Sequence, residues 1–393
     1  MLKGLSRLWW RGVKRVNKAQ HSQGKKLVKA LLAPPAKRSR PKTSRPKSTT
    51  STAYSTATLS AATKPKVGGA SGQLPGKWLA GYCNVLARDG QARQLHARRI
   101  SYWLYLPDRE SIAGLPLVVM LHGCDQTATQ FAAGTRMNHL AEKKGFAVLY
   151  PQQSLRSHSL RCWPWFEKSN QHGGGDVQLI TGAIDKVAQQ YAIDPTRIYV
   201  AGLSAGAAMA HIVALTHPHQ IAAVGLHSGP VFGAGHTRMG AYAVMQGGSI
   251  KASGSAIEEV SRKFGGLPRM PAILMHGEAD HVVRPINQMQ LVQQFKILNR
   301  LGPEHAAPLV FKPAKGGTKN PSNPYRLQDY VVAKKLLLRV CEVFHLDHAW
   351  SGGDCELKYN ACNGPDASKM MWDFFARHRR VTTPSSDVAQ LPQ

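Results

Sequence analysis

Ser204 lies in the pentapeptide Gly202-Leu203-Ser204-Ala205-Gly206, directly after the apolar run "RIYV". A G-x-S-x-G sequence at the end of a strand is typical of a nucleophile elbow, in which the serine occupies a sharp strand-to-helix turn. Glycines on both sides relieve the backbone crowding that a Cβ atom would cause. Because such pentapeptides also occur by chance, an ordinary serine in a glycine-rich turn is the alternative. The pentapeptide alone therefore does not establish Ser204 as a nucleophile, and other residues of the sequence must supply further evidence.

A serine hydroxyl is a weak nucleophile unless a base removes its proton, and an acid must orient that base. In hydrolases of this architecture the acid and then the histidine follow the serine in the chain. Asp280 follows an apolar run in "MHGEADHVV", and His348 lies near the end of the chain in "FHLDHAWSGG". The order predicts Ser204 as nucleophile, Asp280 as orienting acid and His348 as general base.

Neighbouring residues leave alternatives open for both partners. Asp280 could cap the helix that follows it, and His348 could be a surface histidine. The competing acids are Asp329, Asp347 and Asp354, and the competing histidines are His276, His281 and His345. We favour Asp280 and His348. Asp347 is adjacent to His348 in sequence, but the acid must bond the imidazole nitrogen that faces away from the serine.

Acyl transfer also requires hydrogen-bond donors aimed at the developing oxyanion. The residue after the nucleophile normally supplies one backbone N–H, which here is that of Ala205. The loop after an early strand supplies the second, and "LHGCDQT" fits this place with the N–H of Cys124. An ordinary strand-ending turn at His122-Gly123 is the alternative.

Strands and helices that could position these residues alternate along the chain. Strand-like runs are expected at 100–107, 115–123, 146–151, 197–202, 221–229, 271–277 and 331–344, the last of them partly helical in an alternative interpretation. Helices are expected at 131–145, 177–192 and 207–217, with Asp176 as a cap of the second. Continuous apolar strands alternating with helices predict an α/β fold, a mostly parallel sheet with helices on both faces.

The formal net charge of +29 is concentrated at the N-terminus. Seventeen Lys and Arg lie between Lys3 and Lys66, whereas the first acidic residue is Asp89. Residues 1–33 are compatible with a basic amphipathic helix that lies on a surface; a nucleic-acid arm, a transit peptide and a solvated tail are alternatives. The composition predicts a disordered linker at 34–76, a catalytic domain at 77–380 and a flexible tail at 381–393.

Six cysteines in a chain of 393 residues do not indicate a disulfide scaffold, and no metal-binding spacing is present among them. No apolar run reaches the length of a transmembrane helix. The apolar patch at 27–33 is short and contains Lys29, so it does not resemble a signal peptide. These features favour a cytoplasmic protein, with an extracellular one as the alternative.

Five motifs in one order resemble the polyhydroxybutyrate (PHB) depolymerase family of esterases over residues 98–378. They are "LHGC", "CWPWFE", "YAIDPTRIYVAGLSAGAAMA", "HGEADHVVRPIN" and "DHAWSGG…GPDAS". The resemblance implies the α/β-hydrolase fold, the Ser204, Asp280 and His348 triad, and an oxyanion hole from Cys124 and Ala205. It also suggests a Cys124–Cys162 disulfide, for which two free thiols are the alternative; a Cys355–Cys362 pair is suggested by sequence proximity. Trp163, Trp165 and Trp350 could line an ester-binding cleft or pack in the core.

The chain differs from secreted polymer-degrading members, which usually carry a signal peptide and a C-terminal substrate-binding domain. We therefore expect the N-terminal arm to hold the enzyme on an intracellular polymer granule. The expected reaction is hydrolysis of poly(3-hydroxybutyrate) or hydroxyalkanoate oligomers through an acyl-enzyme, without a metal or cofactor. A general or feruloyl-type esterase is the enzymatic alternative. A granule- or nucleic-acid-binding protein with a degenerate hydrolase domain is the non-enzymatic one, and a nucleic-acid partner is not favoured.

Overall fold

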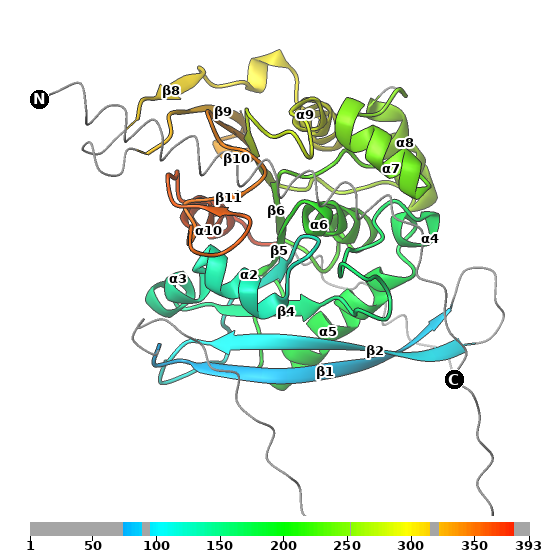
Figure 1. Ribbon diagram of the computed structural model, residues 1–393, viewed down its shortest axis with the longest axis vertical. Helices are drawn as coiled ribbons and strands as arrows, with labels where there is room; N and C mark the ends of the chain where they lie inside the picture. The colour runs from blue at the N-terminus through cyan, green and yellow to red at the C-terminus, as the bar shows by residue number, and fades with distance from the viewer. Residues whose placement is uncertain (1–73, 89–94, 252, 315–321, 381–393) are drawn as a thin grey trace, which may run out of the picture.

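The computed structural model describes residues 74–88, 95–251, 253–314 and 322–380. One large sheet runs through them in the strand order β1-β2-β4-β3-β5-β6-β7-β10-β9-β8 (Figure 1). The six central strands of this order are parallel to one another. They are β4 (Ala147–Gln152), β3 (Leu117–Leu121), β5 (Ile198–Leu203), β6 (Ala223–His227), β7 (Ala272–Gly277) and β10 (Lys335–Val343). Both edges are antiparallel, with β1 (Lys77–Arg88) and β2 (Leu95–Leu106) at one and β9 (Tyr325–Val332) and β8 (Val310–Lys312) at the other. The mostly parallel sheet predicted from the sequence is confirmed.

Helices cover both faces of this sheet, as expected. One face carries α2 (Ala128–Thr135), α3 (Met137–Lys144) and α10 (Ala367–Phe375). The other carries α5 (Asp176–Gln190), α6 (Ala205–Thr216), α7 (Arg238–Gly247), α8 (Ser253–Lys263) and α9 (Ile286–Asn299), with the short α4 (Lys168–Gln171) beside them. Figure 1 shows α2, α3 and α10 on one side of the central strands and α6 to α8 on the other. A 3₁₀ turn (Pro303–His305) and the short strands β11 (Trp350–Ser351) and β12 (Asn360–Ala361) complete the described elements.

The central strands are continuous apolar runs because both of their faces are covered. Every residue of β3, β5, β6 and β7 is buried. Successive side chains of a strand point to opposite faces, so Val119 belongs to one core cluster and Val118 to the other. A sheet buried in this way places all the carboxyl ends of its parallel strands at one edge, where loops can bring distant residues together.

The structure corrects three details of the predicted elements. The helix expected at 131–145 is divided into α2 and α3 by Arg136, whose φ of 55° is left-handed. The strand expected at 331–344 is present as β10 but begins only at Lys335. Ala333 and Lys334 before it both have positive φ and form a two-residue turn that connects it to β9. Asp176 is the first residue of α5 and makes no capping bond. Its carboxylate instead accepts a hydrogen bond from Arg98 at 2.5 Å.

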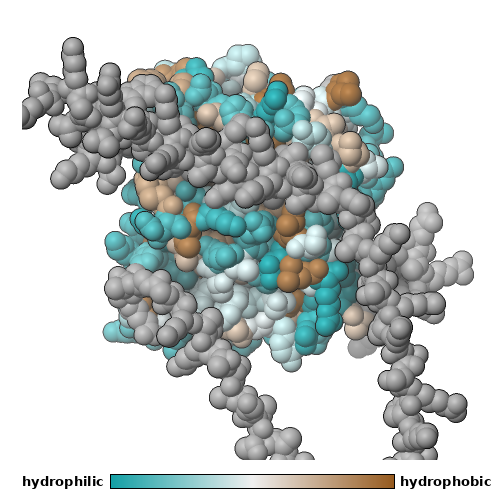
Figure 2. All heavy atoms as spheres, in the orientation of Figure 1, coloured by the Kyte–Doolittle hydropathy of each residue, from teal (hydrophilic) through white to brown (hydrophobic). Residues whose placement is uncertain are grey.

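Several elements had no counterpart in the sequence prediction: β1, β8, β9, α7, α8, α9 and α10. The predicted amphipathic segment 1–33, the linker 34–76 apart from its last three residues, and the tail 381–393 lie outside the described residues. Within the described part of the chain, no helix combines the length and apolarity needed to cross a membrane. Figure 2 shows a largely hydrophilic face with small, separate hydrophobic patches.

Candidate active site

Ser204 occupies the turn between β5 and α6 with φ 58° and ψ −122°. Such a backbone conformation costs a non-glycine residue roughly 1–3 kcal/mol and persists only where its surroundings enforce it. One enforcing contact is the Ser204 N–H, which donates to the carbonyl of His227 at 2.9 Å. Ser204 is 5% exposed. The turn therefore has the geometry of a nucleophile elbow.

The two glycines of the pentapeptide are required by close backbone approach. A Cβ atom at Gly206 would lie 2.0 Å from the carbonyl oxygen of Leu121. At Gly202 it would lie 2.4 Å from the carbonyl carbon of Gly206. The end of β3 and the turn thus pack backbone against backbone. Only glycine fits at these positions, which explains the run of small residues around Ser204.

Asp280 and His348 form a buried hydrogen-bonded pair. Asp280 Oδ2 lies 2.8 Å from Nδ1 of His348, and both residues are more than nine-tenths buried. Asp280 Oδ1 accepts the N–H groups of Val282 and Val283, each at 2.9 Å. Burial raises the pKa of Asp280, but His348 outweighs it and the net pKa lies below the ordinary value. Burial lowers the pKa of His348, but the Asp280 charge and hydrogen bond raise it above the ordinary histidine value.

The competing acids and histidines have other contacts. Asp347 Oδ1 accepts the backbone N–H of His348 at 2.8 Å and does not bond its ring. The other two acids face arginines, Asp329 with Arg339 at 2.6 Å and Asp354 with Arg136 at 3.6 Å. His281 and His345 are exposed.

His276 is the competing histidine that comes closest to the pair. Its Nε2 lies 3.6 Å from Asp280 Oδ2 but 2.7 Å from the carbonyl oxygen of Val283. Nε2 therefore carries a hydrogen and donates to that carbonyl. Burial lowers the pKa of His276, so the ring is neutral and supports the loop of Asp280 instead of replacing His348.

His227, which the sequence analysis did not single out, connects the serine to the histidine. It ends β6, the strand between β5 and β7, and its carbonyl accepts the N–H of Ser204. Its Nε2 accepts the N–H of Ser351, three residues after His348, at 3.2 Å. Burial lowers the pKa of His227 to about 3. This neutral ring therefore holds the Ser204 turn and the His348 loop against one another.

Trp350 supports this connection and is not part of a cleft. It is 0% exposed, its ring stacks on His227 at a centroid distance of 5.1 Å, and its indole N–H donates to Ser368 Oγ at 3.2 Å. Of the two positions left open for Trp350, lining an ester-binding cleft or packing in the core, the structure has the second. A fully buried side chain of this size acts through packing.

A narrow pocket opens beside Ser204. Its walls are largely apolar, and they include Trp163 and Trp165 together with Cys124 and Ala205. A Cβ atom at Gly123 would lie 3.6 Å from Cβ of Ser204. The chain at Gly123-Cys124 therefore runs directly past the serine, and Ala205 follows it at the start of α6. The structure brings both proposed oxyanion donors to the pocket that contains Ser204.

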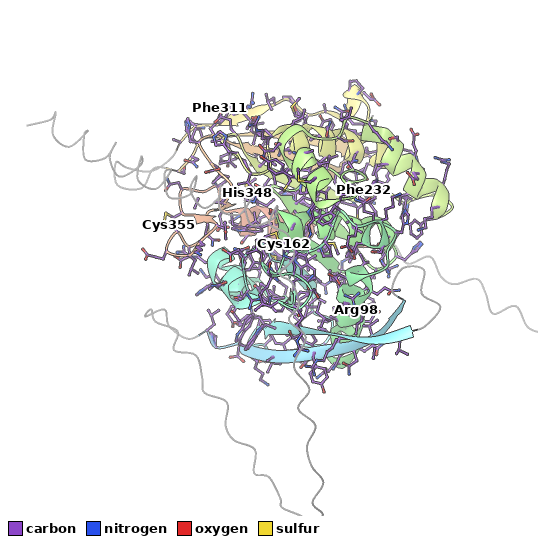
Figure 3. The ribbon with its side chains drawn as sticks, turned by 45° about the vertical axis from the view of Figure 1, so that its right-hand side comes forward. Arg98, Cys162, Phe232, Phe311, His348 and Cys355 are labelled. Carbon is purple, nitrogen blue, oxygen red and sulfur yellow. A yellow bond between two sulfur atoms is a disulfide. The ribbon has the colours of Figure 1, made fainter. Side chains whose placement is uncertain are left out.

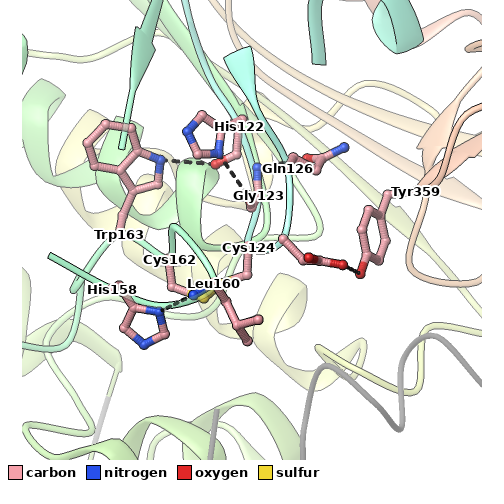
Figure 4. Close-up of a disulfide and its surroundings, with 10 residues drawn as sticks. His122, Gly123, Cys124, Gln126, His158, Leu160, Cys162, Trp163 and Tyr359 are labelled. Carbon is pink, nitrogen blue, oxygen red and sulfur yellow. Dashed lines mark hydrogen bonds between the residues drawn. A yellow bond between two sulfur atoms is a disulfide. The ribbon is translucent and has the colours of Figure 1, made fainter. Parts of the chain in front are cut away.

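The loop that carries Cys124 is held by covalent and polar contacts (Figure 4). A disulfide joins Cys124 to Cys162. The indole N–H of Trp163 donates to the carbonyl of His122 at 3.0 Å. His122 Nε2 accepts the N–H of Gln153 at 3.1 Å, so Nδ1 carries the hydrogen and donates to the Gly123 carbonyl. Burial lowers the pKa of His122 to about 4, which keeps this ring neutral.

The remaining cysteines lie away from the pocket. A second disulfide joins Cys355 and Cys362, and Cys83 and Cys341 are buried free thiols. Figure 3 shows Cys355 at the edge of the molecule and Cys162 and His348 near its middle. The described residues contain no group of three or more His, Cys, Asp and Glu side chains suited to a metal ion.

This arrangement contains the groups needed for acyl transfer. A strained serine lies at the end of β5, and a histidine oriented by a buried carboxylate follows β10. Cys124 and Ala205, the residues proposed to supply the oxyanion donors, line the pocket at the serine. The electrostatic pairing of Asp280 and His348 favours a protonated imidazole once the histidine has accepted a proton. The structure can therefore support attack of a serine hydroxyl on a carbonyl group.

Comparisons with known proteins agree with this chemistry. Residues 100–307 match the family described as Esterase PHB depolymerase. Over 186 residues the chain is 34% identical to poly(3-hydroxyalkanoate) depolymerase C of Paucimonas lemoignei, covering 47% of this chain and 45% of that protein. It is 29% identical over 210 residues to acetylxylan esterase A of Emericella nidulans, and the match covers 50% of this chain and 66% of that protein. The aligned region thus spans less than two thirds of each relative.

A solved structure has a similar fold. The acetyl xylan esterase from Aspergillus awamori superposes with a TM-score of 0.55 at 19% identity, covering 76% of this chain and 99% of that one. At this identity the likeness concerns the fold, which is the α/β-hydrolase fold expected from the sequence.

Proposed function

Because the chain belongs to the Esterase PHB depolymerase family, we propose that it is a serine esterase that hydrolyses poly(3-hydroxybutyrate) or related hydroxyalkanoate oligomers. The observation that carries the proposal is the buried Asp280–His348 hydrogen bond, whose loop is joined to the strained turn of Ser204 through His227. Ser204 is the nucleophile, His348 the general base and Asp280 the acid that orients it.

The reaction proceeds through an acyl-enzyme. Ser204 Oγ attacks the ester carbonyl carbon while its proton passes to Nε2 of His348, and the N–H groups of Cys124 and Ala205 stabilise the oxyanion. The tetrahedral intermediate then expels the alcohol, which takes the proton from His348. Water, deprotonated by the same histidine, attacks the acyl-enzyme. Collapse of the second intermediate releases the carboxylic acid and returns the proton to Ser204.

The polyester substrate is supported by the family and by the similarity to a poly(3-hydroxyalkanoate) depolymerase. A second candidate is a general carboxylesterase, including one for aromatic esters, which the similarity to an acetylxylan esterase favours. A non-catalytic binding protein is disfavoured, because a degenerate domain has no need to retain the Asp280–His348 pair and the strained turn of Ser204.

Release of 3-hydroxybutyrate from native amorphous granules tests the proposal, with a short-chain nitrophenyl ester assayed in parallel. We expect the wild-type protein to act on both substrates and Ser204→Ala to act on neither, with an unchanged melting temperature. Hydrolysis of the small ester alone would move the substrate to soluble esters. Equal activity of Ser204→Ala and wild type would remove Ser204 from the mechanism.

We further propose that the basic segment 1–33 attaches the enzyme to a granule inside the cytoplasm. At helical periodicity the sequence would put Leu2, Leu5, Leu8 and Trp9 on one face and Lys and Arg residues on the other. Such a pattern supports this role, because apolar and cationic groups together favour adsorption to an anionic coat. Deleting residues 1–70 should reduce the granule-bound fraction and leave hydrolysis of a soluble ester unchanged. Undiminished binding of the deletion variant would contradict this role.

A further inference from the structure

The pocket that holds Ser204 contains one permanently charged side chain among its described lining residues, Arg238. Most of its other lining residues are aromatic or aliphatic, with Trp163, Trp165 and Met245 among them. A guanidinium group beside such walls is a strong donor in a region of few competing acceptors. Neither the acyl transfer itself nor the oxyanion hole uses it. Arg238 is thus available to a ligand.

Arg238 has no carboxylate partner within the described part of the chain. It is the first residue of α7 and is exposed, and no hydrogen bond or ion pair is formed by its guanidinium there. A second, wider cleft is lined by Arg238 as well, and it contains the buried acid Asp176. Asp176 already accepts hydrogen bonds from Arg98 at 2.5 Å and from Gln153 Nε2 at 2.6 Å. Glu167 is an exposed acid of the same cleft and forms no ion pair with Arg238. Burial raises the pKa of Glu167 and the Arg238 charge opposes this, so Glu167 competes weakly for the guanidinium.

His158 provides a second donor in the same pocket. Its Nδ1 accepts the N–H of Leu160 at 3.2 Å, so the hydrogen of the neutral ring is on Nε2. Burial and the nearby Arg238 charge lower the pKa of His158, which keeps the ring neutral. A neutral Nε2–H can donate to one carboxylate oxygen while the guanidinium binds the group. The two side chains together suit a carboxylate better than a neutral ester.

The pocket is too narrow to enclose a long substrate, but it continues into a wider cleft. The pocket has a cavity volume of about 20 Å³, whereas the cleft has a volume of about 450 Å³. The two share His158, Cys162, Phe166 and Arg238, and Arg98 and Asp176 line the wider part. Figure 3 labels Cys162, which lines both spaces, and Arg98, which lines only the wider cleft. Arg238 therefore stands where the apolar pocket meets the polar cleft.

We propose that Arg238, assisted by His158, binds a carboxylate carried by the leaving alcohol of the ester. This inference rests on the proposed function and specifies its substrate class as oligomers with a free carboxylate end. In the terminal 3-hydroxybutyrate unit the carboxylate carbon is four bonds from the attacked carbonyl carbon, a reach on the order of 5 Å. Side chains that share one narrow pocket with Ser204 can meet a group at this reach. The enzyme then removes the carboxylate-terminal unit from an oligomer.

Acetate release from 3-acetoxybutyrate and from its methyl ester tests the proposal, since the two substrates differ in the charge of the leaving alcohol. We expect the wild-type full chain to prefer the acid. Arg238→Gln should lower kcat/KM for the acid by roughly tenfold to hundredfold, as expected for a lost charge-assisted hydrogen bond. The value for the methyl ester should stay within about twofold. Arg238→Lys should give an intermediate loss, because charge remains without bidentate geometry.

Two further variants serve as controls. Arg269 is exposed and is absent from the lining of both the pocket and the cleft, so Arg269→Gln should alter neither substrate. Glu167→Gln removes the acid that competes for Arg238 and should raise kcat/KM for the acid substrate. An equal fall for both substrates with Arg238→Gln, or a wild-type enzyme that prefers the methyl ester, would overturn the inference.

Binding to the Ser204→Ala variant separates this inference from the proposed activity. Calorimetric titration with 3-hydroxybutyrate and with its methyl ester should show tighter binding of the acid, and Arg238→Gln in the same background should abolish the difference. If wild type hydrolyses no ester but this preference persists, the proposed function fails and the carboxylate site stands. If hydrolysis is Ser204-dependent but no preference is measured, the carboxylate site fails.

Discussion

Replacing Asp280 by asparagine tests the proposed mechanism at its most specific contact. Oδ1 of Asp280 accepts two backbone N–H groups, from Val282 and Val283, whereas Oδ2 faces Nδ1 of His348. In Asp280→Asn the amide oxygen will keep the first position, because an NH₂ group cannot accept those two donors. The NH₂ group must then face His348. It will donate to Nδ1 and place the ring hydrogen on Nε2.

A histidine with its hydrogen on Nε2 cannot accept the proton of Ser204. The variant also loses the carboxylate charge that stabilises the imidazolium. Removing this charge while keeping the shape of the site lowers kcat by about 10⁴-fold in a serine triad. This corresponds to about 5 kcal/mol of transition-state stabilisation. The acidic side of the pH profile of the remaining activity should move to lower pH. Without the Asp280 carboxylate, the burial that lowers the pKa of His348 is no longer offset by that charge.

The assay is steady-state hydrolysis of a soluble nitrophenyl ester from pH 5 to 9, with thermal unfolding to confirm that each variant folds. Asp347→Asn is the matched control, because Asp347 bonds the backbone N–H of His348 and an amide oxygen can do the same. We expect its kcat to remain within about threefold of wild type. Retention of more than a tenth of kcat by Asp280→Asn, or a large loss in Asp347→Asn, would refute the assignment of the acid.

Three other outcomes follow from the structure. The pKa of His348 lies above the ordinary histidine value, and only the neutral imidazole can act as the base. Wild-type kcat/KM should therefore rise with pH through a midpoint above 6.5 and be lost below that midpoint. A midpoint well under 6 would contradict this. Replacing both Cys124 and Cys162 by alanine removes a disulfide between residues 38 positions apart. Denaturant titrations should then show a free energy of unfolding lower by about 4 kcal/mol. An unchanged value would show that the disulfide does not form. Gly206→Ala should abolish activity and lower the melting temperature, because its Cβ atom would lie 2.0 Å from the Leu121 carbonyl oxygen, and an active, stable variant would refute that close approach.

Much of the central fold was accessible from the sequence because parallel strands buried on both faces are continuous apolar runs. The strands that end at Leu121, Leu203, His227 and Gly277 were all anticipated from such runs. The edge strands and the later helices were not. Pairing at an edge depends on distant partners, as in β1 with β2, and half-exposed strands such as β9 lack the apolar run.

The sequence by itself determined the order and type of the reacting groups: a serine between glycines, then an aspartate and a histidine, each placed after a strand. These are local features, since a tight turn requires particular residues at particular spacings. The tertiary structure decided which acid faces the imidazole, because Asp280 lies 68 positions from His348 and meets it only where β7 and β10 end side by side. It also decided that Trp350 packs in the core instead of lining a cleft, and it brought Arg238 to the pocket of Ser204. Contacts of this kind arise from how strands are ordered in the sheet, which no local pattern of residues records.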